Sequence, residues 1–164
     1  MAQDGDSLQD HANRLIGLPD FGKDGFPAAL VISGPRGCAT LRIDAALTFD
    51  EPPRKAVLMA RALGAEHCAL LFPSHLRFAG STGFACLVAV SVDAAGSQMT
   101  LFARRQGVAH PLRSGLVGTA PPAGSVAALS SLVAVETSDE DVQRAWQQLE
   151  AMGVSIAASG RVLH

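Results

Sequence analysis

The sequence predicts a single α+β domain with a mostly antiparallel sheet and two main packed helices, in the order β-β-α-β-β-β-β followed by β-α-β. Alternating apolar and polar residues between positions 28 and 105 indicate strands. An almost wholly apolar segment at 53–63 and an amphipathic one near the C-terminus indicate the helices. A chain of 164 residues can bury its own core, so we expect one domain over 1–164.

The N-terminal part predicts little regular structure before the first strand. Residues 1–7 are polar and acidic, so we expect them to be disordered and not to act as a signal peptide. A short helix is expected from Ser7 to Ile16, and the residues from Leu18 to Phe26 form a loop rich in Pro, Gly and Asp.

Two strands are expected at Ala28–Ser33 and Cys38–Phe49, joined by the turn at 34–37. In the second strand apolar residues alternate with Arg42 and Asp44, so one face belongs to the core and the other is polar. The turn resembles a phosphate loop only superficially, because it lacks the lysine and the following helix.

The helix expected at 53–63 begins after two prolines and ends at Gly64, in agreement with the usual positions of Pro and Gly at helix ends. It is apolar nearly all round, so it should be covered on more than one side. Charged residues make up only 17% of the chain. Both features lead us to expect a homodimer or a larger homo-oligomer.

Further strands are expected at 67–72, 76–79, 84–92 and 99–105, followed by a long linker at 106–124. The C-terminal part then predicts a β-α-β unit. A buried strand covers 130–136, Thr137 or Ser138 caps a helix, and a new strand begins at Val154 after Gly153. The helix carries an apolar stripe, on which we expect Trp146 to be largely buried and to face the sheet: Val142, Ala145, Trp146, Leu149 and Met152.

Composition restricts the cellular setting and the partners. Three widely spaced cysteines without a C-x-x-C motif argue against a disulfide framework and favour a reducing, cytoplasmic compartment. We expect all three to be unpaired, with Cys68 and Cys86 buried. The formal charge of −2 gives no reason to expect nucleic acid, and no apolar run is long enough to span a membrane.

The best candidate ligand surface is the polar strand face that carries Arg42, Asp44, His75 and Arg77. Residues two apart in a strand share a face, so these side chains could line a concave pocket for an anion or a carboxylate. The alternative is a solvated outer face with ordinary surface charges. His67 and Cys68 are adjacent in a strand and point to opposite faces, so they cannot form a catalytic dyad. We assign no catalytic residue.

The five histidines, at 11, 67, 75, 110 and 164, show no metal-binding spacing. A metal site would have to be assembled from distant strands, and nothing in the sequence supports one, so we expect no metal. We also expect no cofactor.

The segment Leu132–Thr137 with Asp139–Trp146 and Leu149–Val154 resembles the start of a module in the vicinal oxygen chelate superfamily, the glyoxalase and bleomycin-resistance group. The resemblance implies two related modules, at 40–105 and 130–164. The family's metal-binding members place a histidine or glutamate early in the first strand of each module, and here those positions hold Ser130-Ser131 and Thr40 to Arg42.

These departures favour a cytoplasmic, metal-free small-molecule-binding relative. The alternatives are a metal-dependent lyase or isomerase of the same superfamily, and a structural or interaction subunit without a small ligand.

Overall fold

The computed structural model describes residues 3–43, 52–76, 83–111, 123–133 and 136–153, and within these ranges the chain forms an α+β fold. Six strands make one antiparallel sheet in the order β2-β1-β3-β4-β5-β6. The strands are β1 (Ala28–Gly34), β2 (Gly37–Ile43), β3 (His67–Leu76), β4 (Phe84–Asp93), β5 (Gly96–Arg105) and β6 (Val108–Pro111). The helices are α1 (Gln3–Ile16), α2 (Arg54–Leu63), α3 (Ala123–Val133) and α4 (Asp139–Ala151).

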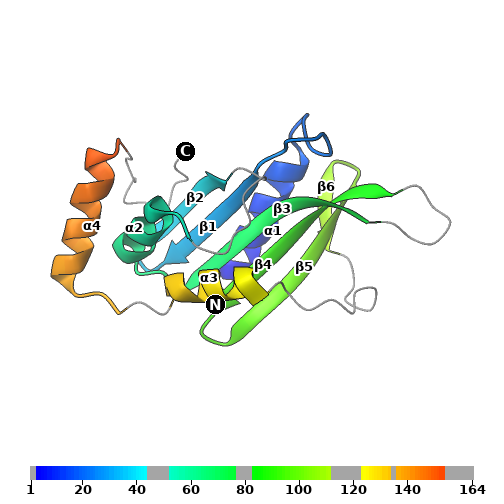
Figure 1. Cartoon of the computed structure of the whole chain (residues 1–164). Helices are drawn as coiled ribbons and strands as arrows, with labels where there is room; N and C mark the ends of the chain where they lie inside the picture. The colour runs from blue at the N-terminus through cyan, green and yellow to red at the C-terminus, as the bar shows by residue number, and fades with distance from the viewer. Residues whose placement is uncertain (1–2, 44–51, 77–82, 112–122, 134–135, 154–164) are drawn as a thin grey trace.

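Helices cover both faces of the sheet (Figure 1). On one face, α1 and the loop after it enclose a core that includes Ile16, Phe26 and Leu71. On the other face, α2, α3 and α4 enclose a larger core that includes Leu30, Met59 and Leu129. In β1 to β5, successive residues point to opposite cores, as the two-residue period of a strand requires.

Side chains of α1 reach both edge strands of the sheet. His11 lies 3.9 Å from the Cys38 sulfur in β2, while Gln9 donates a hydrogen bond to the Ala109 carbonyl in β6 at 2.7 Å. Asn13 accepts one from the Ala109 amide at 2.9 Å. Six flat strands would span about 24 Å, which is far wider than one helix. The sheet therefore curls around α1, which lies on its concave side.

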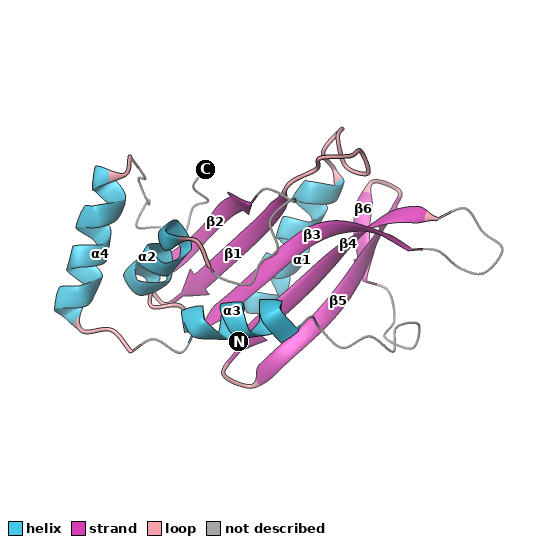
Figure 2. Cartoon of the chain, in the orientation of Figure 1, coloured by secondary structure: helices cyan, strands magenta, loops and turns pink. Residues whose placement is uncertain are grey.

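Hairpins connect most neighbouring strands (Figure 2). The expected turn between β1 and β2 is confirmed. The strands expected at 67–72 and 76–79 form the single strand β3 as far as Leu76, and it runs through Pro73. The pairing of β3 with β1 ends at Leu71, so the missing amide of Pro73 breaks no bond to that strand.

The apolar helix is covered on more than one side, as its sequence predicts. α2 packs against β1 and β2 on one side and against α4 on the other, with contacts to α3. It follows Pro53 and ends at Gly64, whose φ of 66° is the left-handed conformation that glycine adopts easily. The apolar faces of α2 are therefore covered by other elements of the same chain.

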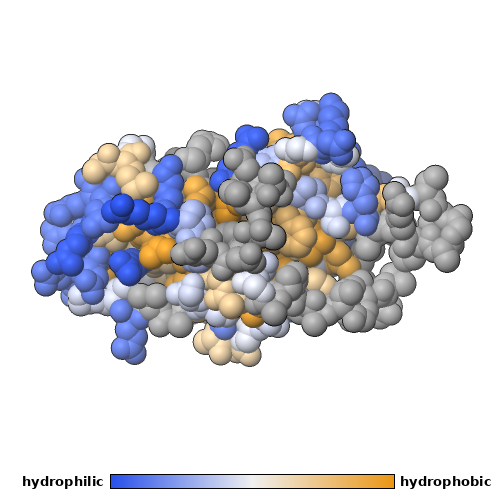
Figure 3. All heavy atoms as spheres, viewed as in Figure 1, coloured by the Kyte–Doolittle hydropathy of each residue, from blue (hydrophilic) through white to orange (hydrophobic). Residues whose placement is uncertain are grey.

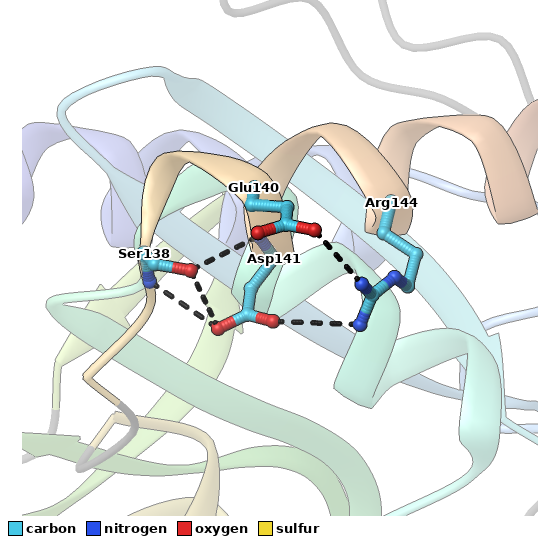
Figure 4. A network of polar contacts seen from close by, with 4 residues as sticks. All are labelled: Ser138, Glu140, Asp141 and Arg144. Carbon is cyan, nitrogen blue, oxygen red and sulfur yellow. Dashed lines mark hydrogen bonds and ion pairs between the residues drawn. The ribbon is translucent and has the colours of Figure 1, made fainter.

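α4 begins with the expected capping box. The Ser138 hydroxyl accepts a hydrogen bond from the Asp141 amide at 3.2 Å, and Asp141 bonds back to Ser138 (Figure 4). Arg144 adds contacts to Glu140 and Asp141 at 3.3 and 3.8 Å. The outward face of α4 is hydrophilic (Figure 3, left).

The orientation expected for α4 needs correction. Val142, Ala145 and Leu149 are buried, but Trp146 is only half-buried and Met152 is 43% exposed. The main packing partner of α4 is α2, and the sheet lies beyond that helix. A stripe that packs on one neighbouring helix buries fewer positions than one enclosed between a helix and a sheet.

Three segments differ from their expected structure. The strand expected at 130–136 is helical through Val133, because it continues α3, and Ser131 donates to the Ala128 carbonyl within that helix at 2.6 Å. The expected linker at 106–124 contains β6, paired with β5, and the first two residues of α3. α1 begins at Gln3, so it includes residues 3–7, which we expected to be disordered. The strand expected after Gly153 lies outside the described residues.

Candidate functional site

Arg42 lies on the concave face, where it lines a hollow of about 280 Å³. We expected a polar face here, but α1 covers an apolar core on it, because β1, β3 and β4 also send apolar side chains to this side. Arg42 pairs with Ala29, and Ala29 pairs with Leu71, which belongs to the core beneath α1. The loop after α1 forms the rest of the wall with residues 18–20 and 23–27. We call this space the Arg42 hollow.

The loop is held in place by Arg104 of β5. Its guanidinium donates to the carbonyl oxygens of Ile16 and Leu18 at the end of α1, and it lies 5.6 Å from the centre of the Phe21 ring. Phe21 in turn meets Phe26 edge to face at 5.5 Å, and both rings are buried. These contacts shape the loop, so the hollow does not depend on its exposed charges for its form.

Among the described residues, four charged side chains line the Arg42 hollow. Lys23 and Asp20 form an exposed ion pair at 3.3 Å. Within the described residues, Arg42 and Asp24 form no ion pair and no side-chain hydrogen bond, either with each other or with another group. The hollow thus presents one guanidinium and one carboxylate that are free to meet a ligand, beside apolar walls from Phe26, Leu18 and the neighbouring prolines.

Of the other predicted site residues, His75 alone is described, and it is not among the residues that line this hollow. His75 is exposed on the same face, but it lies four residues along β3 from Leu71, the residue level with Arg42. With the two strand spacings between them, this places Arg42 and His75 about 16 Å apart. Gly22 of the loop lies against Ala85, the cross-strand partner of His75. Asp44 and Arg77 lie outside the described residues.

A second hollow, of about 400 Å³, lies at the opposite end of the concave face beside the β4–β5 turn. It is lined by Leu8, His67, Ser91, Asp93 and residues 95–98, and we call it the hairpin hollow. His67 and Asp93 are cross-strand partners. One Asp93 carboxylate oxygen accepts from the amides of Ala95 and Gly96 at 2.8 and 3.2 Å. That carboxylate is therefore partly used in holding the turn.

His11 and Cys38 meet between α1 and the edge strand β2, a contact that the sequence did not single out. Burial lowers the pKa of His11 below its usual range, and the positive charge of Arg14 lowers it further, against a smaller opposing effect of Asp10. The imidazole is thus held in its neutral form. One signal was present in the sequence: His11 stands at helical spacing among Leu8, Ala12 and Leu15, on the buried stripe of α1.

The remaining reactive side chains lie apart from both hollows. Cys68 and Cys86 are buried in the core under α2 and α3, as expected, and burial raises the pKa of the Cys68 thiol to about 12. His67 faces the opposite side of the sheet from Cys68. In the part of the chain that the structure describes, no three or more His, Cys, Asp or Glu side chains gather in a metal-binding arrangement.

Comparisons with protein-family models, with curated proteins and with solved structures give no match to this chain. Among the described helices, none is both long enough and apolar enough to cross a bilayer.

Proposed function

We propose that this protein binds a small carboxylate-bearing molecule in the Arg42 hollow. The observation that carries the proposal is the position of Arg42, whose guanidinium lines a concave space and has no acidic partner among the described residues. A guanidinium presents parallel N–H donors that match the two oxygens of a carboxylate.

The size and the walls of the hollow restrict the class of ligand that it can bind. Ligand pockets commonly enclose about 300–1,000 Å³, so a space of about 280 Å³ suits a small metabolite better than a nucleotide or a peptide. Phe26, Leu18 and the two prolines offer apolar surface beside the charge. A short carboxylic acid with an apolar tail satisfies both requirements.

Isothermal titration calorimetry with 4-methylpentanoate tests the proposal. The unchanged protein should bind the acid, and Arg42→Gln should weaken binding by about tenfold or more, because it removes a charge-assisted hydrogen bond worth about 1.5–3 kcal/mol. Arg61→Gln is the matched control, since Arg61 is exposed on α2 and belongs to the opposite side of the sheet. Equal affinity in Arg42→Gln and the unchanged protein would rule out this site.

The rival enzyme function, a metal-dependent lyase or isomerase, has a separate test. We propose a metal-free protein, a relative of the glyoxalase group working in the cytoplasm. Elemental analysis of the purified protein should therefore find no stoichiometric metal. Bound zinc, nickel, iron or manganese near one ion per chain would favour the enzyme instead.

A further inference from the structure

We infer that the ligand of the Arg42 hollow is a zwitterion, a free α-amino acid with an apolar side chain. This inference rests on the proposed function, because it assumes that Arg42 receives the carboxylate. It adds the second charge of the ligand and assigns its recognition to Asp24.

Among the described residues, the charges that line the hollow balance. Asp20 and Lys23 pair with each other at 3.3 Å, which leaves Arg42 and Asp24 as the available cation and anion of this part of the chain. A simple anion would meet Arg42 but would also be repelled by Asp24. A ligand that carries both charges meets a complementary group at each end.

The lack of a direct contact between Arg42 and Asp24 also favours a zwitterion. Arg42 and Asp24 line the same space, yet they form no ion pair with each other. A ligand placed between them can therefore bond to the guanidinium through its carboxylate and to Asp24 through its ammonium group. Two groups in direct contact would instead have satisfied each other.

The apolar wall provides for the side chain of the ligand. Phe26 is buried at the base of the loop, and Leu18 is 45% exposed although it is a large apolar residue. Covering Leu18 with an aliphatic side chain removes apolar surface from water. Leucine or a residue of similar size fits these three requirements together.

Three compounds separate the parts of the inference. Leucine carries both charges, 4-methylpentanoate lacks the ammonium group, and 3-methylbutylamine lacks the carboxylate. The unchanged protein should bind leucine about tenfold or more tightly than either of the others. Asp24→Asn should reduce the affinity for leucine to that for 4-methylpentanoate. It should not weaken the binding of 4-methylpentanoate itself. Asp10→Asn is the control, because Asp10 is an exposed acid of α1 that does not line the hollow.

The outcomes distinguish this inference from the proposed function. Equal binding of leucine and 4-methylpentanoate, with both weakened by Arg42→Gln, would overturn the zwitterion and leave the carboxylate site intact. Unchanged leucine affinity in Asp24→Asn would overturn the role of Asp24. Failure of all three compounds to bind, or binding of 3-methylbutylamine alone, would overturn both.

Discussion

Arg42 illustrates how far a single residue can be placed from the sequence. Its alternation with apolar neighbours in β2 predicts that it lies opposite the core formed by those neighbours, and the structure places it there, on the face that α1 covers. Its distance from His75 could not be predicted, because it depends on the pairing of β2, β1 and β3. The loop that completes the hollow depends on Arg104, which is more than sixty positions away from Arg42 in sequence.

His11 gives the stability of the protein a dependence on pH. Its pKa is lowered in the folded state below the ordinary value of 6.5. When the pH falls below that value, the unfolded chain takes up a proton that the folded chain does not, so stability decreases with falling pH. The loss should begin near pH 6.5 and continue down to the pKa of the folded state.

His11→Gln should remove this part of the pH dependence, because glutamine does not titrate and has a similar size. Urea unfolding at pH 7.5 and at pH 5.5 measures the effect. His110→Gln, at an exposed position of β6, should keep the difference seen in the unchanged protein. If His11→Gln retains the full difference in stability between the two pH values, the claim that His11 is buried in its neutral form is wrong.

At the scale of elements, caps were easier to predict than apolar runs. The residues after Thr137 carry a hydroxyl, a carboxylate three positions on and an apolar stripe, and all three signals belong to the same helix start. The apolar run before them has no such capping signals. Leu129 to Val133 suits a buried strand or a buried helix equally well, and the alanines at 127 and 128 favour the helix that forms.

The same ambiguity bears on the resemblance to the vicinal oxygen chelate superfamily. The strand on which it was based is helical from Ser130 to Val133, while the capped helix after it forms as expected. The resemblance stays a prediction. β6 was missed for a different reason: its turn is only Gln106 and Gly107, both with positive φ, and Gln-Gly is a weaker turn signal than Asn-Gly.

The capping box gives a direct test of α4. Ser138→Ala should destabilise the protein by about 1 kcal/mol, because the Asp141 amide loses its acceptor. Thr137→Ala is the matched control, since Thr137 was the alternative cap and makes no cap contact here. Urea unfolding compares the two. A larger loss in Thr137→Ala would mean that the helix begins one residue earlier.

At the scale of the molecule, α4 acts as the outer cover of α2. The apolar faces of α2 were one reason to expect a homo-oligomer, and the chain itself already covers them. The low charge content remains as the other reason, so the homo-oligomer stays a prediction. The layering of α4 on α2, and of α2 on the sheet, depends on contacts between distant segments that no local pattern encodes.

Leu149 tests this layering. It lies on the inner face of α4 and is fully buried in the core. Leu149→Ala should therefore cost about 2–5 kcal/mol out of a total stability of about 5–15 kcal/mol. Gln147→Ala, on the exposed side of the same helix, should change stability by less than about 0.5 kcal/mol. Thermal unfolding with light scattering should also show earlier aggregation for Leu149→Ala, because the apolar surface of α2 becomes accessible. Similar melting of both variants would show that α4 does not cover the core.

The central claim is that a small ligand binds in the Arg42 hollow and not elsewhere on the concave face. The most direct measurement is a two-dimensional ¹H–¹⁵N NMR titration of the labelled protein with leucine. We expect progressive shifts of the amide signals from the loop at 18–26 and from β2 around Arg42, with the signals of His67, Ser91 and Asp93 unchanged. Shifts concentrated in the hairpin hollow, or no shifts with either leucine or 4-methylpentanoate at millimolar concentration, would contradict the account.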